Sequence, residues 1–160
     1  MRSIERAFLP SLKRPVKFSK LVSGTEGGEA ESAIWKQEVG KLGERLSASY
    51  LKREKGMKIL YRNFRAPKGG EIDLICRDGD TLVFAEVKTR TSLRYGRPAE
   101  AVNKKKQTLI VRGALEWLRQ LDHPDVLFRF DIVEVLLKDG DVPDINLIRN
   151  AFNLPEHLIY

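Results

Sequence analysis

The chain has 160 residues, of which 42% are hydrophobic and 32% are charged, a composition typical of a folded domain rather than a disordered segment. Its net charge of +7 favours an acidic partner, and no apolar run reaches the roughly 18 residues that would predict a membrane span. The single cysteine, Cys76, excludes an internal disulfide and fits a cytoplasmic location, and the isolated His123 and His157 have no zinc-binding spacing.

Residues 1–35 differ from the rest of the chain. Basic residues and two prolines mark the first twenty positions, and a stretch rich in glycine at 23–29 has the composition of a linker. We therefore predict a basic, disordered N-terminal extension over residues 1–35 and a single domain over residues 36–160.

The first predicted element of the domain is a helix at about residues 32–55. Its apolar positions recur at helical spacing, and Gly56 follows as a natural end. These positions are Trp35, Val39, Leu42 and Leu46. A strand is predicted at 57–64. Two more are predicted at 71–77 and 81–89, joined by the hairpin dipeptide Asp78-Gly79.

A second helix is predicted at about residues 102–121. Its inward side comprises Leu109, Ala114, Trp117, Leu118 and Leu121. A strand at 128–137 and a short final element near 145–152 complete the chain. The order of elements predicts a small mixed α/β sheet flanked by helices.

Two of the predicted strands carry acidic residues where a core strand would carry valine or isoleucine. They are Glu71-Ile-Asp73-Leu-Ile75 and Phe84-Ala-Glu86-Val-Lys88. Because strand side chains alternate between faces, Glu86 and Lys88 are expected to share one face, opposite Val83, Ala85 and Val87. Asp73 is expected to share a face with Glu71 and Ile75, opposite Ile72, Leu74 and Cys76.

If the two strands pair as a hairpin, Asp73, Glu86 and Lys88 converge on one patch. Two carboxylates about 4 Å apart repel by about 4 kcal/mol at an effective dielectric constant near 20. A hard divalent metal relieves such repulsion and prefers oxygen ligands, so the pattern indicates metal-dependent phosphodiester chemistry. The alternative is that Lys88 simply neutralises Glu86 in a buried ion pair.

The segment after the acidic strand is strongly basic. Between residues 88 and 106 it carries seven basic residues and one acidic residue, Glu100. The basic residues are Lys88, Arg90, Arg94, Arg97, Lys104, Lys105 and Lys106. We predict that those from Arg90 to Lys106 contact a nucleic-acid backbone, and the alternative is a solvated helix face.

Glu44 is a third candidate acid, on the first predicted helix. Small residues surround it: Gly40, Gly43 and Ala48. They allow the helix to approach a sheet closely, so that Glu44 reaches toward the strand carboxylates. The alternative is a surface acid that pairs with Lys41 or Lys52.

Several blocks of the chain resemble the YraN family of small, functionally uncharacterised bacterial proteins. The blocks are Gly40-x-x-Gly43-Glu44, Arg62-Asn63, Gly70-Glu-Ile-Asp-Leu-Ile75, Phe84-Ala-Glu-Val-Lys-Thr-Arg90, Tyr95-Gly96 and Arg129-Phe-Asp131. The resemblance covers residues 36–137. It implies a restriction-endonuclease-like α/β core, a mixed β-sheet flanked by α-helices, with distant similarity to archaeal Holliday junction resolvases. Ile72 stands where that superfamily often has proline, but this position supplies no ligand.

The resemblance also implies roles for the acidic residues. Asp73 and Glu86 would ligate Mg2+ or Mn2+, with help from the Val87 carbonyl and, through water, from Glu44. Lys88 would orient the attacking water or stabilise charge on the transition state. Asp131 is either a partner of this site or the acceptor for Arg129.

The sequence thus predicts a Mg2+-dependent DNA endonuclease, and the family analogy suggests branched DNA as its substrate. RNA stays open as a partner, no membrane is expected, and the resolvase analogy suggests a homodimer. The rival hypothesis is a non-catalytic nucleic-acid-binding module that retains the nuclease fold.

Overall fold

The computed structural model describes residues 12–17, 29–92, 94, 96, 99 and 102–155, with side chains from residue 32 onward in the first helix. These residues form two helices and five strands. In chain order they are α1 (Glu29–Arg53), β1 (Lys58–Arg65), β2 (Glu71–Asp78), β3 (Thr81–Arg90), α2 (Lys104–Gln120), β4 (Leu127–Leu136) and β5 (Asp144–Phe152).

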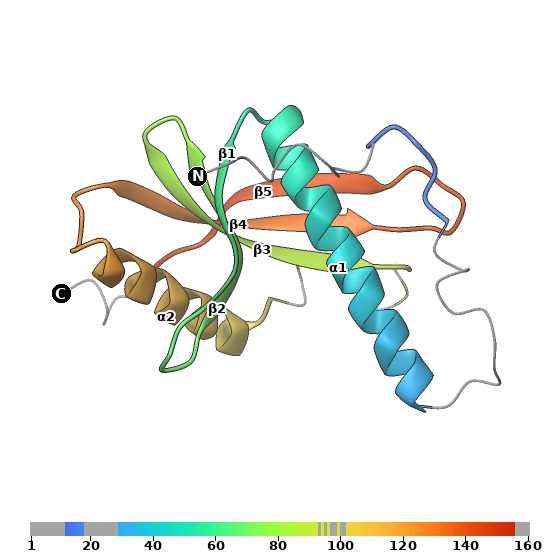
Figure 1. Ribbon diagram of the computed structural model, residues 1–160, viewed down its shortest axis with the longest axis horizontal. Coiled ribbons are helices and arrows are strands. Elements are labelled where there is room, and N and C mark those ends of the chain that lie inside the picture. The colour runs from blue at the N-terminus through green and yellow to red at the C-terminus, as the bar shows by residue number, and fades with distance from the viewer. Residues whose placement is uncertain are drawn as a thin grey trace, which may run out of the picture.

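The five strands form one mixed sheet in the order β1-β2-β3-β4-β5 (Figure 1). Neighbouring strands are antiparallel except β3 and β4, which are parallel. A parallel pair needs a crossover, and α2 lies in the connection between β3 and β4. The mixed sheet with its two helices confirms the predicted α/β class and is consistent with a restriction-endonuclease-like core.

Each helix covers one face of the sheet with its own apolar core. Val39, Leu42 and Leu46 of α1 pack against Leu74, Cys76, Val83, Ala85, Val87 and the buried valines of β4. Ile110, Val111, Ala114 and Leu118 of α2 pack against Ile72, Ile75, Phe84, Phe130 and Ile132. The predicted apolar side of the first helix is therefore confirmed. One prediction for the second helix is wrong, because Leu121 caps the end of α2 and is 51% exposed.

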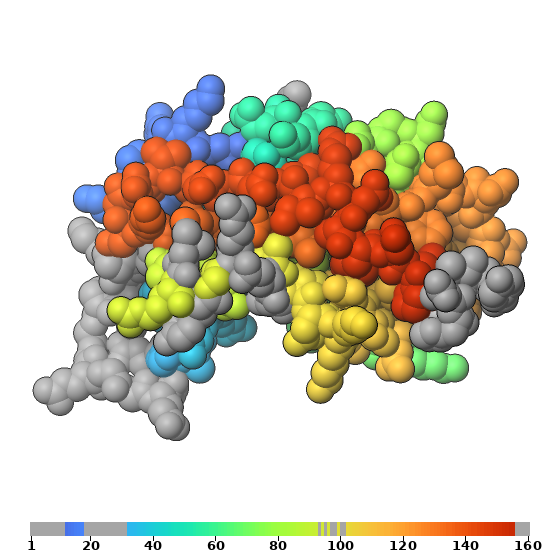
Figure 2. All heavy atoms as spheres, turned by 180° about the vertical axis from the view of Figure 1, so that it is seen from behind, coloured from blue at the N-terminus to red at the C-terminus, as the bar shows by residue number. Residues whose placement is uncertain are grey.

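The final predicted element, near residues 145–152, is the strand β5, and its predicted bounds are confirmed to within one residue. β5 has nine residues and pairs antiparallel with β4, with an irregularity between Phe130 and Ile132. Figure 2 shows β5 along the surface of the molecule, with the start of α2 below it. This edge strand exposes much of its length, so its polar residues obscure the alternation that marks a strand in the sequence.

Part of the predicted N-terminal extension contacts the domain. The backbone amide of Val16 donates to the Asp141 carbonyl at 2.9 Å, and Gly140 donates to the Val16 carbonyl at 2.8 Å. α1 also begins at Glu29, before the predicted boundary at residue 36. Residues 1–11 and 18–28 lie outside the described residues, so their predicted disorder stays a prediction.

The β1–β2 hairpin changes the direction of its side chains in mid-strand. Arg62 pairs with Leu74, which belongs to the core under α1, whereas Phe64 pairs with Ile72 in the core under α2. Asn63 lies between these pairs with a left-handed φ of 52°, a conformation that asparagine tolerates better than most residues. The expectation that Ile72, Leu74 and Cys76 share one face is therefore wrong at Ile72, because simple alternation fails beside Asp73.

Candidate functional site

The candidate site lies where β2 separates from β3. The ladder between these strands runs from Asp78–Thr81 to Leu74–Ala85 and does not continue to Asp73 and Glu86. β3 instead continues its pairing with β4 as far as Arg90. Asp73 occupies this fork, where its Oδ2 accepts a 2.7 Å hydrogen bond from the backbone amide of Val87.

Glu86 is the most enclosed acid of the site, with only 1% of its side chain exposed. Its Oε1 lies 2.8 Å from Lys88 Nζ and 3.3 Å from Lys106 Nζ. Its Oε2 is buried and has no hydrogen-bond partner among the described residues. Burying a carboxylate oxygen without a hydrogen-bond partner costs free energy. This oxygen is therefore available to bind a cation.

Lys106 joins this site rather than the basic surface of α2. Its Nζ lies 2.5 Å from Glu71 Oε1, and its side chain is 17% exposed. Asn103 caps the helix and accepts a 3.0 Å hydrogen bond from the Lys106 backbone amide, which fixes the first turn of α2 beside the strands. Sequence reasoning grouped Lys106 with Lys104 and Lys105. The contacts that separate Lys106 from them depend on where α2 crosses the sheet.

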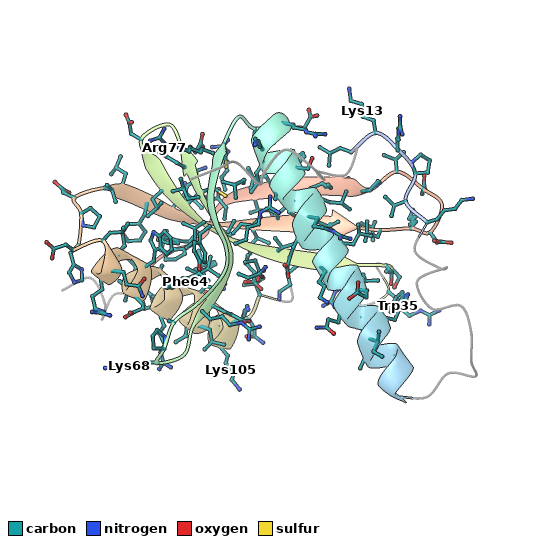
Figure 3. All side chains as sticks on the ribbon, in the orientation of Figure 1. Lys13, Trp35, Phe64, Lys68, Arg77 and Lys105 are labelled. Atoms are coloured by element: carbon teal, nitrogen blue, oxygen red, sulfur yellow. The ribbon has the colours of Figure 1, made fainter. Side chains whose placement is uncertain are left out.

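The remaining candidate nucleic-acid contacts lie around the site. Lys104 and Lys105 are exposed, and Figure 3 shows Lys105 pointing away from the N-terminal end of α2. Arg94 is exposed, and Arg90 is partly buried at the end of β3. Arg97 lies outside the described residues.

Burial and the neighbouring charges raise the pKa values of some residues of the site and lower those of others. Burial, with the nearby Glu86 carboxylate, raises the pKa of Asp73 to about 7, and the charge of Glu44 adds to this rise. The hydrogen bond from Lys106 lowers the pKa of Glu71. Burial opposes the charged form of Lys106, but its contact with Glu71 and the charges of Glu86 and Asp73 outweigh burial and raise its pKa.

The donor set fits a hard divalent cation. Asp73 and Glu86 present carboxylate oxygens on both sides of the fork, and Glu86 Oε2 is without a partner among the residues described. Mg2+ is usually bound through one or two carboxylates, with water and substrate phosphate completing its coordination. Two protein carboxylates are therefore a sufficient set.

Glu44 lies near this pair without joining it. In the described part of the chain, no three acidic, histidine or cysteine side chains cluster closely enough to hold one metal ion. The structure therefore does not place Glu44 as a direct ligand beside Asp73 and Glu86, and a contact through water stays a prediction. Glu44 also forms no ion pair with Lys41 or Lys52. Lys41 instead contacts Glu38 at 2.8 Å.

A close helix–sheet contact brings Glu44 this near. A Cβ added to Gly43 would lie 1.8 Å from Thr89 Oγ1 on β3. Only glycine permits this approach, so the residue before Glu44 sets the distance between α1 and the strand that carries Glu86 and Lys88.

Two other acids have structural partners. Asp131 is buried and accepts from Arg129 Nε at 3.0 Å and from the Asn150 amide at 3.0 Å, which selects the second of its two predicted roles. Glu134, which the sequence did not single out, is also buried. It accepts from the Ala99 amide at 3.0 Å and so holds the connection between β3 and α2.

The fold is that of a small α/β protein, consistent with a restriction-endonuclease-like core. Residues 43–135 match the model of the uncharacterised protein family UPF0102, and this span includes Glu44, Asp73, Glu86, Lys88 and Lys106. The chain belongs to this family, which is the YraN family of the sequence resemblance.

Relatives from several organisms align over most of their lengths. A UPF0102 protein of Trichlorobacter lovleyi is 47% identical over 119 residues, covering 74% of this chain and 92% of the relative. UPF0102 proteins of Caldicellulosiruptor saccharolyticus and Rhodococcus opacus are 45% and 48% identical, covering 73% and 71% of this chain and 98% and 95% of the relatives. Among the described residues, no helix is long and apolar enough to cross a membrane.

Proposed function

We propose that this protein is a Mg2+- or Mn2+-dependent endonuclease that cleaves DNA at the Asp73–Glu86 site. The observation that carries the proposal is the buried Oε2 of Glu86, which faces no hydrogen-bond donor among the described residues while Asp73 lies across the fork. Two carboxylates beside two lysines are the groups that phosphodiester hydrolysis needs.

Asp73 and Glu86 would hold the metal, with the Val87 carbonyl as a further oxygen donor. A bound Mg2+ or Mn2+ would stabilise charge on the phosphate and lower the pKa of a water molecule. The hydrogen bond from the Val87 amide fixes one oxygen of Asp73, which leaves its other oxygen for the cation. Asp73 must be ionised to do this, so its raised pKa makes metal binding weaker below about pH 7.

Lys88 is the residue we assign to the scissile phosphate. Its side chain is 26% exposed although it contacts the buried Glu86, so its ammonium group lies at the boundary between site and solvent. There it can orient the attacking water or donate to an oxygen that gains charge in the transition state. Lys106 holds Glu71 and Glu86 in place from the first turn of α2.

Lys104 and Lys105 extend the site toward the flanking phosphates. Both are exposed on the same turn of α2 whose third lysine reaches the acids. A nucleic acid held by these lysines would therefore pass next to Glu86. Selectivity for branched DNA, a homodimer and a cytoplasmic location remain expectations from the sequence.

One observation favours the non-catalytic alternative. Lys88 and Lys106 both approach Glu86 Oε1, so the charge of Glu86 is compensated without a metal. A protein that only binds nucleic acid could keep this ion-pair cluster for stability alone. Metal binding separates the two hypotheses.

The test is cleavage of labelled duplex, flap, four-way-junction and single-stranded DNA, with matching RNA strands, in Mg2+ or Mn2+ and in EDTA. Asp73→Asn and Lys88→Ala are compared with Asp80→Asn and Lys138→Ala, which remove the same charges at exposed turns. Metal-dependent cutting that both site variants lose and both controls keep would support the nuclease. Binding without cutting by the unaltered protein, and without heat on metal titration, would support the non-catalytic module.

A further inference from the structure

A second basic site lies beside the acidic one, on the α1 face of the sheet. A pocket of about 230 Å³ opens between α1 and the β1–β2 hairpin. Its lining consists of Lys41, Glu44, Arg45, Arg62, Asn63 and Leu74. Figure 1 shows α1 crossing the sheet beside this hairpin. None of its three cationic residues belongs to the basic segment at 88–106.

The lining of the pocket carries more positive than negative charge. Three cationic side chains face one carboxylate, Glu44. Lys41 contacts Glu38 at 2.8 Å, but this pair is exposed and holds the lysine only weakly. Arg45 and Arg62 have no ion pair or side-chain hydrogen bond to any residue that the structure describes. Two free guanidinium groups in one hollow offer the forked donors that bind phosphate oxygens in pairs.

The backbone places Arg62 in this pocket for a specific reason. Regular alternation would turn Arg62 to the same face as Phe64, which packs under α2. The left-handed φ of 52° at Asn63 reverses the alternation, so Arg62 pairs with Leu74 on the α1 face. Irregularities that re-aim a strand side chain are common next to functional sites. The Arg62-Asn63 block of the family resemblance thus supplies two of the residues that line the pocket.

The pocket adjoins the acidic site directly. Leu74 in its wall follows Asp73 in the chain, and Glu44 lies close enough for its charge to act on Asp73. Lys104 and Lys105 lie at the start of α2, which covers the opposite face of the sheet. The acids at the fork therefore have cationic groups on both sides.

We propose that Lys41, Arg45 and Arg62 form a phosphate-binding pocket that holds the nucleic-acid backbone beside the Asp73–Glu86 fork, across from Lys104 and Lys105. The ligand group is a backbone phosphodiester, and the choice of DNA as its source rests on the proposed function. The nucleic-acid backbone then crosses the fork between these two groups of cationic side chains, which positions one phosphodiester at Glu86.

The experiment measures binding of labelled duplex DNA by fluorescence anisotropy, with the full chain carrying Asp73→Asn and with EDTA present, so that no cutting occurs. Arg45→Ala combined with Arg62→Ala should weaken binding about tenfold and reduce the slope of log affinity against log salt by about two, since each phosphate contact contributes about 0.9. Lys52→Ala combined with Lys138→Ala removes the same charge at exposed positions outside the pocket and should change the slope by less than about one. Arg45→Lys with Arg62→Lys should restore the slope but only part of the affinity, because lysine lacks the forked donors.

Equal loss in the pocket pair and the control pair would overturn the proposal, because general charge would then explain it. A nucleoside monophosphate that binds the pocket, with DNA binding unchanged in the pocket pair, would also overturn it in favour of a free nucleotide. Thermal melting shows whether each variant is folded, and Arg45→Lys with Arg62→Lys carries the test if the alanine pair is not. The binding measurement stands whether or not the unaltered protein cuts DNA, so failure of the nuclease proposal and failure of this one are distinguishable.

Discussion

Asp73 Oδ2 accepts a 2.7 Å hydrogen bond from the backbone amide of Val87, at the point where β2 has ceased to pair with β3. The carboxylate thus replaces a carbonyl of the missing ladder. This bond places Asp73 beside Glu86 and satisfies the amide that the fork would otherwise leave unpaired. The same separation of β2 from β3 therefore also brings Asp73 next to Glu86.

The first prediction concerns the stability of the metal-free protein. The pKa of Asp73 is raised in the folded state from 3.8 to about 7, so its ionisation disfavours folding. The loss of stability is absent below about pH 4, grows as the pH rises and is complete above about pH 7. Asp73→Asn should therefore raise the free energy of unfolding in EDTA at pH 8 by up to about 4 kcal/mol, at 1.36 kcal/mol per pKa unit.

Chemical denaturation between pH 4 and 8 measures this difference. The gain should shrink steadily toward pH 4, and Asp80→Asn, at an exposed turn, should show no comparable trend. A gain that does not change with pH would mean that Asp73 titrates normally.

The second prediction is that metal reverses this penalty. Mn2+ at about one hundred times its dissociation constant should stabilise the unaltered protein by about 2.7 kcal/mol, and Asp73→Asn should abolish the effect. Because the ligand must be deprotonated, the increase in melting temperature should be larger at pH 8 than at pH 6. Equal stabilisation of the protein and of Asp73→Asn would place the metal elsewhere.

The third prediction concerns two glycines of α1 that differ in their surroundings. A Cβ on Gly43 would lie 1.8 Å from Thr89 Oγ1, whereas a Cβ on Gly40 would meet nothing within 4 Å. Gly43→Ala should destabilise the fold by about 1–3 kcal/mol through overpacking. Gly40→Ala should stabilise it by up to about 1 kcal/mol through helix propensity.

Adding Thr89→Gly to Gly43→Ala removes the side chain that clashes, and should recover part of the loss relative to Thr89→Gly alone. Urea denaturation of the four variants measures this coupling. If Gly43→Ala and Gly40→Ala behave alike, α1 does not depend on the close contact that brings Glu44 toward β3.

The sequence predicted the elements well because their cues are local. Trp35, Val39 and Leu46 mark the apolar side of α1, and Asp78-Gly79 marks the hairpin. The pairing of Glu86 with Lys88 also follows from strand alternation, and the structure shows this contact at 2.8 Å. Each of these cues involves residues within a few positions of one another.

The sequence could not predict features that depend on tertiary structure. Strand periodicity assigned Ile72 and Leu74 to one face, but they lie in different cores, opposite the part of β1 where Asn63 has a left-handed backbone. Composition grouped Lys106 with two surface lysines, whereas its contact with Glu86 depends on where α2 crosses the sheet. Long-range packing decides both positions.

The fourth prediction separates the three lysines of α2. Lys104→Ala with Lys105→Ala should weaken DNA binding and lower the salt slope by about two, because both side chains are exposed and free to contact phosphate. Lys106→Ala should change the slope less, since its ammonium group contacts Glu71 and Glu86. It should instead lower the cleavage rate. Anisotropy titrations at several salt concentrations measure the slopes. An unchanged slope in the double variant would mean that Lys104 and Lys105 lie on a solvated helix face and do not contact DNA.

The central claim is that Asp73 and Glu86 form a metal-dependent cutting site. Its most direct test is the single-turnover cleavage rate of DNA at pH 8 in Mn2+, with enzyme in excess, for the unaltered protein, Asp73→Asn and Asp80→Asn. We predict cleavage that EDTA abolishes, a loss of at least about a thousandfold in Asp73→Asn, equivalent to about 4 kcal/mol in the barrier, and no loss in Asp80→Asn. Cleavage by Asp73→Asn at the rate of the unaltered protein, or no cleavage by the unaltered protein on any of the DNA substrates, would contradict the claim.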